Sequence, residues 1–137
     1  MEKFKDMPFE PKRNNRFLVE FPKQFNIQQW SIQKINKPKF TGGNWENIKI
    51  EFVDPIGPST SQGLFQIVEF LKNNKNESKC LFEIKIKSLD PTGVEVEEWV
   101  VYIGEILTIN FGELDYGDDK IQQPFLVAKP LNCLLKY

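Results

Sequence analysis

The sequence contains no histidine, which removes the commonest general base, the commonest metal ligand and the usual pH switch among protein side chains. Only two cysteines are present, Cys80 and Cys133, and they lie far apart in apolar, strand-like contexts. Free cysteines in such contexts are usually small buried hydrophobes. Their spacing leaves a disulfide open, whereas a metal site would need further ligands that the chain does not offer.

An excess of charge and a long apolar run are also lacking. The formal net charge is −1, from 18 basic and 19 acidic side chains, so the chain has no global attraction for nucleic acid or for an anionic membrane. No segment approaches the length of a transmembrane helix, and residues 1–16 have no apolar core of a secretory signal. We therefore expect a protein that is made and kept in a cytoplasm and has no membrane partner.

Aromatic residues are abundant, with 12 phenylalanines and three tryptophans in 137 residues, and they favour strands. The length predicts one domain. Residues 1–15 contain prolines and a basic run without any period of 2 or 3.6, yet Phe4, Met7 and Phe9 are apolar. We interpret this segment as an extended N-terminal arm that docks on something, such as a neighbouring subunit.

Alternating apolar and polar side chains predict about seven strands. Gly104 predicts a bulge or a kink, and Pro124 and Pro130 predict that the last strand is an edge or carries a break, because proline cannot donate to a sheet. A turn at 90–93 has the sequence Asp-Pro-Thr-Gly. The predicted strands lie at 16–21, 27–35, 48–52, 82–87, 94–103, 106–111 and 125–137.

One helix interrupts the strands. Leu64, Ile67, Val68 and Leu71 have the spacing of one helical face, and Ser59 or Thr60 is positioned to cap its start. A single helix among many strands makes alternating βαβ winding improbable. Residues 16–137 are therefore predicted to form one mainly β domain, a β-sandwich or small barrel with one packed α-helix.

No arrangement of residues predicts catalysis. Glu95, Glu97 and Glu98 resemble a carboxylate pair, but a solvated strand face explains them better. The acidic group at 113–119 lacks the order of a calcium-binding loop. The basic residues near Phe40 suggest single-strand binding only weakly, because acids lie nearby. We predict no enzyme activity, no cofactor and no metal.

From Leu89 to Tyr116 the sequence resembles the tail tube proteins of contractile-tailed (T4-like) bacteriophages. The matching segments are Leu-Asp-Pro-Thr-Gly-Val at 89–94, Val-Glu-Glu-Trp at 96–99 and Ile-Asn-Phe-Gly-Glu-Leu-Asp-Tyr at 109–116. Residues 15–21 are similar to the first strand of that family. The resemblance implies hexameric rings that stack into a tube, a surrounding sheath, a baseplate and DNA that passes through the lumen. It places the chain in the tail of a virion assembled in the host cytoplasm.

The same resemblance suggests which residues face neighbours and which face the lumen. The loop at 36–46 is long for a hairpin connection, and it joins the arm as a candidate contact between subunits. Lysines on the same strands as the lumen candidates weaken that assignment. The candidate contact residues are Phe4, Met7, Phe9, Lys37, Phe40, Trp45, Asp115 and Tyr116, and the candidate lumen residues are Glu51, Glu83, Glu95 and Glu97.

Two alternatives remain open at this point. A bacterial contractile injection or secretion device uses a tube subunit of the same kind. A monomeric β-sandwich that binds a glycan or a host surface would instead expose an aromatic patch at Trp30 or Trp45.

Overall fold

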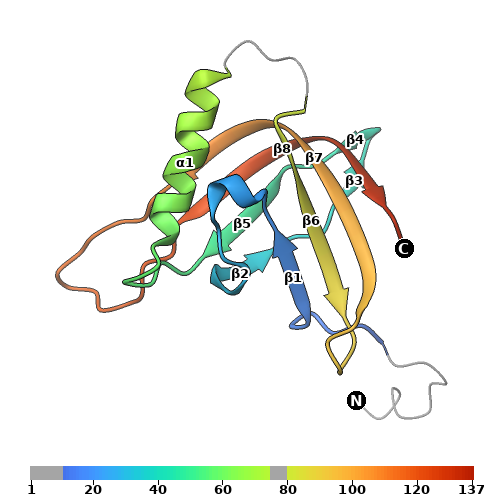
Figure 1. Cartoon of the computed structure of the whole chain (residues 1–137), viewed down its shortest axis with the longest axis horizontal. Helices are drawn as coiled ribbons and strands as arrows, with labels where there is room; N and C mark the ends of the chain where they lie inside the picture. The colour runs from blue at the N-terminus through green and yellow to red at the C-terminus, as the bar shows by residue number, and fades with distance from the viewer. Residues whose placement is uncertain (1–10, 75–79) are drawn as a thin grey trace.

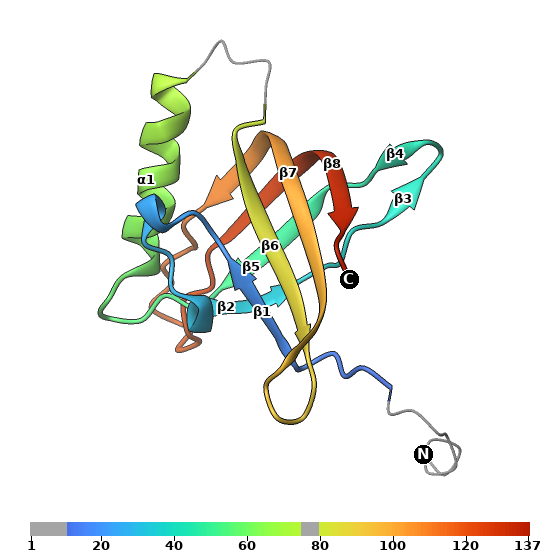
Figure 2. The ribbon, with the colours of Figure 1, turned by 45° about the vertical axis from the view of Figure 1, so that its right-hand side comes forward.

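The computed structural model describes residues 11–74 and 80–137 and confirms the mainly β fold with one helix. Six antiparallel strands form one sheet in the order β1-β6-β7-β8-β5-β2, which curls into a nearly closed, barrel-like wall with helix α1 beside it (Figures 1 and 2). The strands of this sheet are β1 (Phe17–Glu20), β2 (Ile32–Ile35), β5 (Ile48–Phe52), β6 (Phe82–Leu89), β7 (Glu95–Asn110) and β8 (Phe125–Leu135). The remaining elements are the 3-10 turns η2 (Lys23–Phe25) and η3 (Gln29–Ser31), the hairpin strands β3 (Phe40–Thr41) and β4 (Asn44–Trp45), and α1 (Thr60–Asn73).

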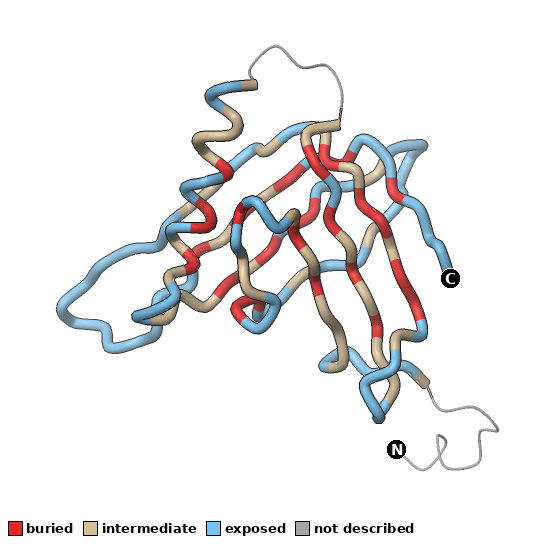
Figure 3. Tube along the Cα trace, in the orientation of Figure 1, coloured by how far each residue is buried: buried red, intermediate tan, exposed pale blue. Residues whose placement is uncertain are grey.

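The period of two in the sequence creates the core. Along β6, Phe82, Ile84 and Ile86 are buried, while Glu83 between them is exposed (Figure 3). The buried side chains of β1, β5, β6, β7 and β8 meet inside the curled sheet in a single cluster. Full burial of each such aliphatic side chain contributes about 2 kcal/mol of transfer free energy, so this cluster is the main stabilising feature of the fold.

The prediction of one strand over 27–35 is wrong in its first half. The backbone N–H and the Oγ of Ser31 both donate to the carbonyl of Gln28, at 3.1 and 2.6 Å, which closes the turn η3. This local hydrogen bonding competes with extended structure, so strand β2 begins only at Ile32. Trp30 lies on the turn and is 59% exposed, whereas Ile32 is buried.

The two long strands carry the predicted irregularities. The sheet register shifts around Gly104, which confirms the bulge, and a side chain there would meet Leu131 Cγ at 2.6 Å. Strand β8 is not simply an edge, because it lies between β7 and β5. Its pairing with β5 ends at Ala128, just before Pro130, and the rest of β8 pairs with β7 alone. The proline therefore marks the point at which β8 loses its second neighbour.

Helix α1 is capped by a residue that the sequence pattern did not indicate. The side chain of Ser59 makes no cap hydrogen bond. Asp54 accepts instead from the backbone N–H of Thr60 at 2.9 Å and from the hydroxyl of Ser61. A carboxylate at a helix N-terminus also interacts favourably with the helix dipole. Leu64 and Ile67 are fully buried, as predicted for the apolar face of this helix.

Candidate assembly surfaces

A buried carboxylate fastens the N-terminal segment and the 36–46 loop to the sheet. Glu97 is 7% exposed and accepts from Lys12 Nζ at 2.6 Å, from Lys37 Nζ and from Trp99 Nε1 at 3.0 Å. Burial raises the pKa of the Glu97 carboxyl, but the hydrogen bonds from Lys12 and Lys37 outweigh burial and leave the pKa below its ordinary value. Glu97 is therefore ionised and doubly paired at neutral pH.

On the other face of the sheet, one lysine, Lys87, lies among three carboxylates. Lys87 Nζ lies 3.0 Å from Glu20, 3.1 Å from Glu95 and 3.9 Å from Glu98. Burial lowers the pKa of Lys87, but hydrogen bonds to Glu20 and Glu95 outweigh it and raise the pKa above its ordinary value. Lys136 adds a second ion pair to Glu98 at 3.4 Å.

These contacts correct the expectation that Glu95 and Glu97 share one solvated strand face. Strand β7 bulges opposite Ser88 and Leu89, so that Glu97 pairs with Ser88 and Glu95 pairs with Leu89. The extra residue, Val96, breaks the simple alternation. Glu97 consequently lies with the core-facing residues, and Glu95 lies with Lys87 on the outer face.

The outer face of the sheet carries the other lumen candidates. Glu51 on β5 and Glu83 on β6 alternate with core residues, and Glu83 is exposed. Lys49 shares this face of β5 and lies over the Phe125 ring at 4.6 Å. The lumen assignment stays a prediction, with Glu97 separated from the other three candidates.

The hairpin β3–β4 forms an aromatic projection. The rings of Phe40 and Trp45 lie 5.0 Å apart, and Trp45 lies 6.1 Å from Trp99. Trp45 Nε1 donates to Asn132 Oδ1 at 3.2 Å, so Trp45 holds the hairpin against β8. Phe40 is 60% exposed and is the part of the hairpin available to a neighbour. Phe4, Met7 and Phe9, the apolar residues of the arm, lie outside the described residues.

The segment 111–123 is exposed along its whole length and is acidic. Leu114 and Tyr116 are almost fully solvent-exposed, on either side of Asp115. Asp115 and Asp118 each accept a backbone N–H two residues further on, at 2.9 Å, which gives the segment a series of turns. Two of the predicted contact residues, Asp115 and Tyr116, thus lie on an exposed loop.

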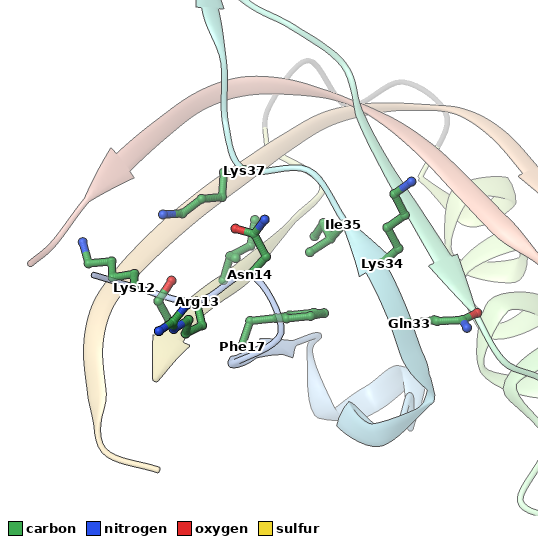
Figure 4. A pocket seen from close by; sticks show the side chains of 10 residues that line it. Lys12, Arg13, Asn14, Phe17, Gln33, Lys34, Ile35 and Lys37 are labelled. Carbon is green, nitrogen blue, oxygen red and sulfur yellow. The ribbon is translucent and has the colours of Figure 1, made fainter. Parts of the chain in front are cut away.

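Sequence reasoning missed a cleft at the seam of the barrel. The free edges of β1 and β2 face the same cleft of about 450 Å³, with Phe17 projecting from β1 toward β2 (Figure 4). Its apolar floor comes from Phe17, Ile35 and Ile86. The cationic side chains lining the cleft are Lys12, Arg13, Lys34 and Lys37. The basic run at 12–13 and the lysines at 34 and 37 were visible in the sequence, but only the curl of the sheet brings them together.

The described ranges also contain the two cysteines, several potential metal ligands and helix α1. Cys80 and Cys133 are free thiols, and burial raises the pKa of Cys133 to about 11. No group of three or more potential metal ligands gathers in residues 11–74 and 80–137. Among these same residues, no helix is long and apolar enough to span a membrane.

Solved structures with a similar fold include chains of an extracellular contractile injection system and of the anti-feeding prophage baseplate. A chain of a contractile injection system, the PVC sheath/tube terminator in the extended state, matches with a TM-score of 0.66 and 15% identity over 96% of this chain and 100% of its own. The PVC sheath–tube complex in the extended state gives a TM-score of 0.64 and 15% identity, with 92% of this chain and 91% of the other covered. The six-fold symmetrised baseplate of the anti-feeding prophage gives 0.58 and 17%, with coverages of 93% and 96%.

No protein-family model matches the sequence, and no curated protein matches it. At these identities the structural likeness establishes the fold, and it covers nearly the whole of each chain.

Proposed function

We propose that this chain is a structural, ring-forming subunit of the tube of a contractile particle. The observation that carries the proposal is the nearly closed six-stranded sheet with an open seam, matched over almost its whole length by chains of sheath–tube and baseplate assemblies. Exposed strand edges are usually covered or paired, and head-to-tail contacts between copies cover them while generating closed rings. Sheath and baseplate proteins are the expected partners.

The finer proposal is a phage tail tube of hexameric rings around a lumen through which DNA passes. The resemblance of residues 89–116 to tail tube proteins supports it. The charge pattern of the outer sheet face supports it too, because Lys87 is neutralised by three carboxylates and offers little to a phosphate backbone. On this proposal Glu51, Glu83 and Glu95 line the lumen, and the chain belongs to the tail of a virion.

A tube subunit of a bacterial injection device is the second candidate. It is favoured by the structural neighbours, two of which come from an extracellular contractile injection system. Particles purified with this chain would separate the two candidates. A DNA-filled head on the particle would support the phage, and a headless particle without nuclease-resistant DNA would support the injection device.

The experiment that tests the shared proposal is negative-stain electron microscopy of the purified chain over a concentration series. We expect rings or hollow stacked tubes whose fraction rises with concentration. A chain that stays monomeric at high concentration, and does not assemble when mixed with preformed baseplates either, would contradict the tube proposal. It would favour a monomeric binding module with Trp30 or Phe40 as its exposed aromatic contacts.

A further inference from the structure

We propose that the basic seam cleft binds the acidic segment 111–123 of a second copy of this chain. The proposal rests on the ring-forming function above and names the two surfaces that meet. It assigns the cleft at the seam and the loop between β7 and β8 as the two halves of one head-to-tail contact.

The cleft has a cationic rim that is only partly neutralised. Glu97 pairs with both Lys12 and Lys37, so one carboxylate serves two ammonium groups, whose side chains remain about half exposed. Arg13 and Lys34 are exposed, and neither has an ion pair within the described part of the chain. Among residues 11–74 and 80–137, no carboxylate lines the cleft itself. An acidic ligand would therefore find unpaired positive charge there.

The floor of the cleft is apolar, so a fitting ligand needs apolar side chains as well as negative charge. Phe17 and Ile35 are half-buried, and they come from two strands that each have a free hydrogen-bonding edge. In Figure 4 the Phe17 ring and Ile35 lie between the cationic side chains. A fitting occupant is an exposed segment in which acidic side chains flank apolar ones, because the acids can pair with the cationic rim while the apolar side chains cover the floor.

The segment 111–123 has this composition. It contains Glu113, Asp115, Asp118 and Asp119 against one basic residue, Lys120. Three of its apolar side chains are mostly exposed: Leu114 is 85%, Tyr116 113% and Ile121 61% exposed. In the segment, the apolar Leu114 lies between the carboxylates of Glu113 and Asp115, whereas in the cleft the apolar floor lies between cations. The two surfaces therefore have the same arrangement with opposite charges. Complementary potentials of this kind fix partner and register.

A single copy presents both surfaces, so a contact between them is heterologous. The segment follows β7 and precedes β8, whereas the cleft lies at β1 and β2, the two ends of the sheet order. Two different patches that meet head to tail generate a ring when the rotation closes. A nucleic acid is the competing occupant, but the apolar floor offers nothing to a phosphate backbone.

The first test measures binding to the cleft directly. A fluorescein-labelled peptide of residues 111–123 is titrated with the full chain at concentrations where the chain is monomeric. We expect Arg13→Glu combined with Lys34→Glu to weaken binding at least about tenfold. The matched control, Lys23→Glu combined with Lys129→Glu, makes the same charge change at exposed sites away from the cleft and should bind the peptide like the wild type.

The second test uses assembly and rescue. Glu113→Lys with Asp119→Lys reverses charge without touching the two turn-forming aspartates, and we expect it to abolish rings, as the cleft reversal does. All four substitutions in one chain should restore rings, because the reversed positions on the two surfaces then carry opposite charges again. The inference would be overturned if both charge-reversal variants still formed rings. It would also be overturned if the four-fold variant formed no rings although circular dichroism showed it to be folded. Either result would leave the tube proposal standing.

Two further outcomes are decisive. If the peptide does not bind, and a labelled single-stranded oligonucleotide binds in a manner lost in the cleft variant, the cleft is a nucleic-acid site and the inference is wrong. If the peptide binds as expected but the wild type never forms rings, either alone or with preformed baseplates, the contact between copies stands and the tube proposal fails.

Discussion

The two faces of the β6–β7 ladder each carry a cluster of ion pairs, and the central charge is negative on one face and positive on the other. On the core-facing side one carboxylate, Glu97, is held by two lysines, and on the outer side one ammonium, Lys87, is held by three carboxylates. The partners of Glu97 are about half exposed, whereas Glu98 beside Lys87 is nearly buried. Removing the central charge should therefore cost little on the core-facing side and much on the outer side.

The largest effect is expected from Lys87→Met. It leaves three carboxylates close together without their shared cation, and one of them, Glu98, is 6% exposed. Lys136 still pairs with Glu98, but Glu20 and Glu95 lose their charge-assisted hydrogen bonds, so we expect a loss of about 2 kcal/mol of unfolding free energy. Urea unfolding measures it. Lys85, two residues away on the same strand, forms no ion pair with any residue that the structure describes, so Lys85→Met serves as the control. Equal losses in the two variants would contradict the role of Lys87.

A smaller effect is expected from Glu97→Gln. The amide keeps the hydrogen bond to Trp99 in reach, and Lys12 and Lys37 can regain water, so we expect a loss of about 1 kcal/mol. The more specific result is local. Amide hydrogen exchange should accelerate around residues 12 and 37 and remain unchanged in β6. Unchanged exchange at both segments would show that Glu97 does not fasten them, and Glu46→Gln, in an exposed pair at 3.9 Å, is the control.

The two clusters should also differ in their pH dependence. The pKa of Glu97 lies below its ordinary value of 4.5, so its contribution is present above about pH 4.5 and is lost as the pH falls through the folded-state pKa. The pKa of Lys87 lies above 10.5, so its contribution is present below about pH 10.5 and is lost as the pH rises through the folded-state pKa. The stability difference between wild type and Glu97→Gln should shrink only in acid, and that for Lys87→Met only in alkali. The reverse pattern in urea midpoints would refute both assignments.

Much of the fold could be predicted, because alternation and helical spacing are local properties. Strands such as β5 and β6, the apolar face of α1 and the Gly104 bulge all follow from side chains within a few residues of one another. The start of β2 could not be predicted, since it depends on the hydrogen bonds of Ser31. The cap from Asp54 was missed because it acts from six residues before the helix begins.

Much less of the candidate site could be predicted from the sequence. The Glu97 cluster joins residues 12, 37 and 97, and the seam cleft joins β1 to β2 across the whole sheet order. These contacts depend on sheet curl, which has no signature in a window of the sequence. The segment Glu-Val-Glu-Glu at 95–98 even gave a misleading pattern, because one bulged residue places Glu95 and Glu97 on opposite faces.

The smallest expected effect tests that bulge directly. Deletion of Val96 would convert Leu89–Glu95 and Ser88–Glu97 into adjacent regular pairs, so both glutamates should keep their faces. Val96 is 40% exposed, and we expect its deletion to cost less than about 1 kcal/mol. The decisive measurement is a pair of double-mutant cycles in urea. In the deletion background Lys87→Met and Glu97→Gln should each retain their full cost, because neither cluster has lost a partner. If the cost of Glu97→Gln disappears there, the deletion has not preserved the Leu89–Glu95 and Ser88–Glu97 pairs, and the single extra residue does not account for the difference between the two faces.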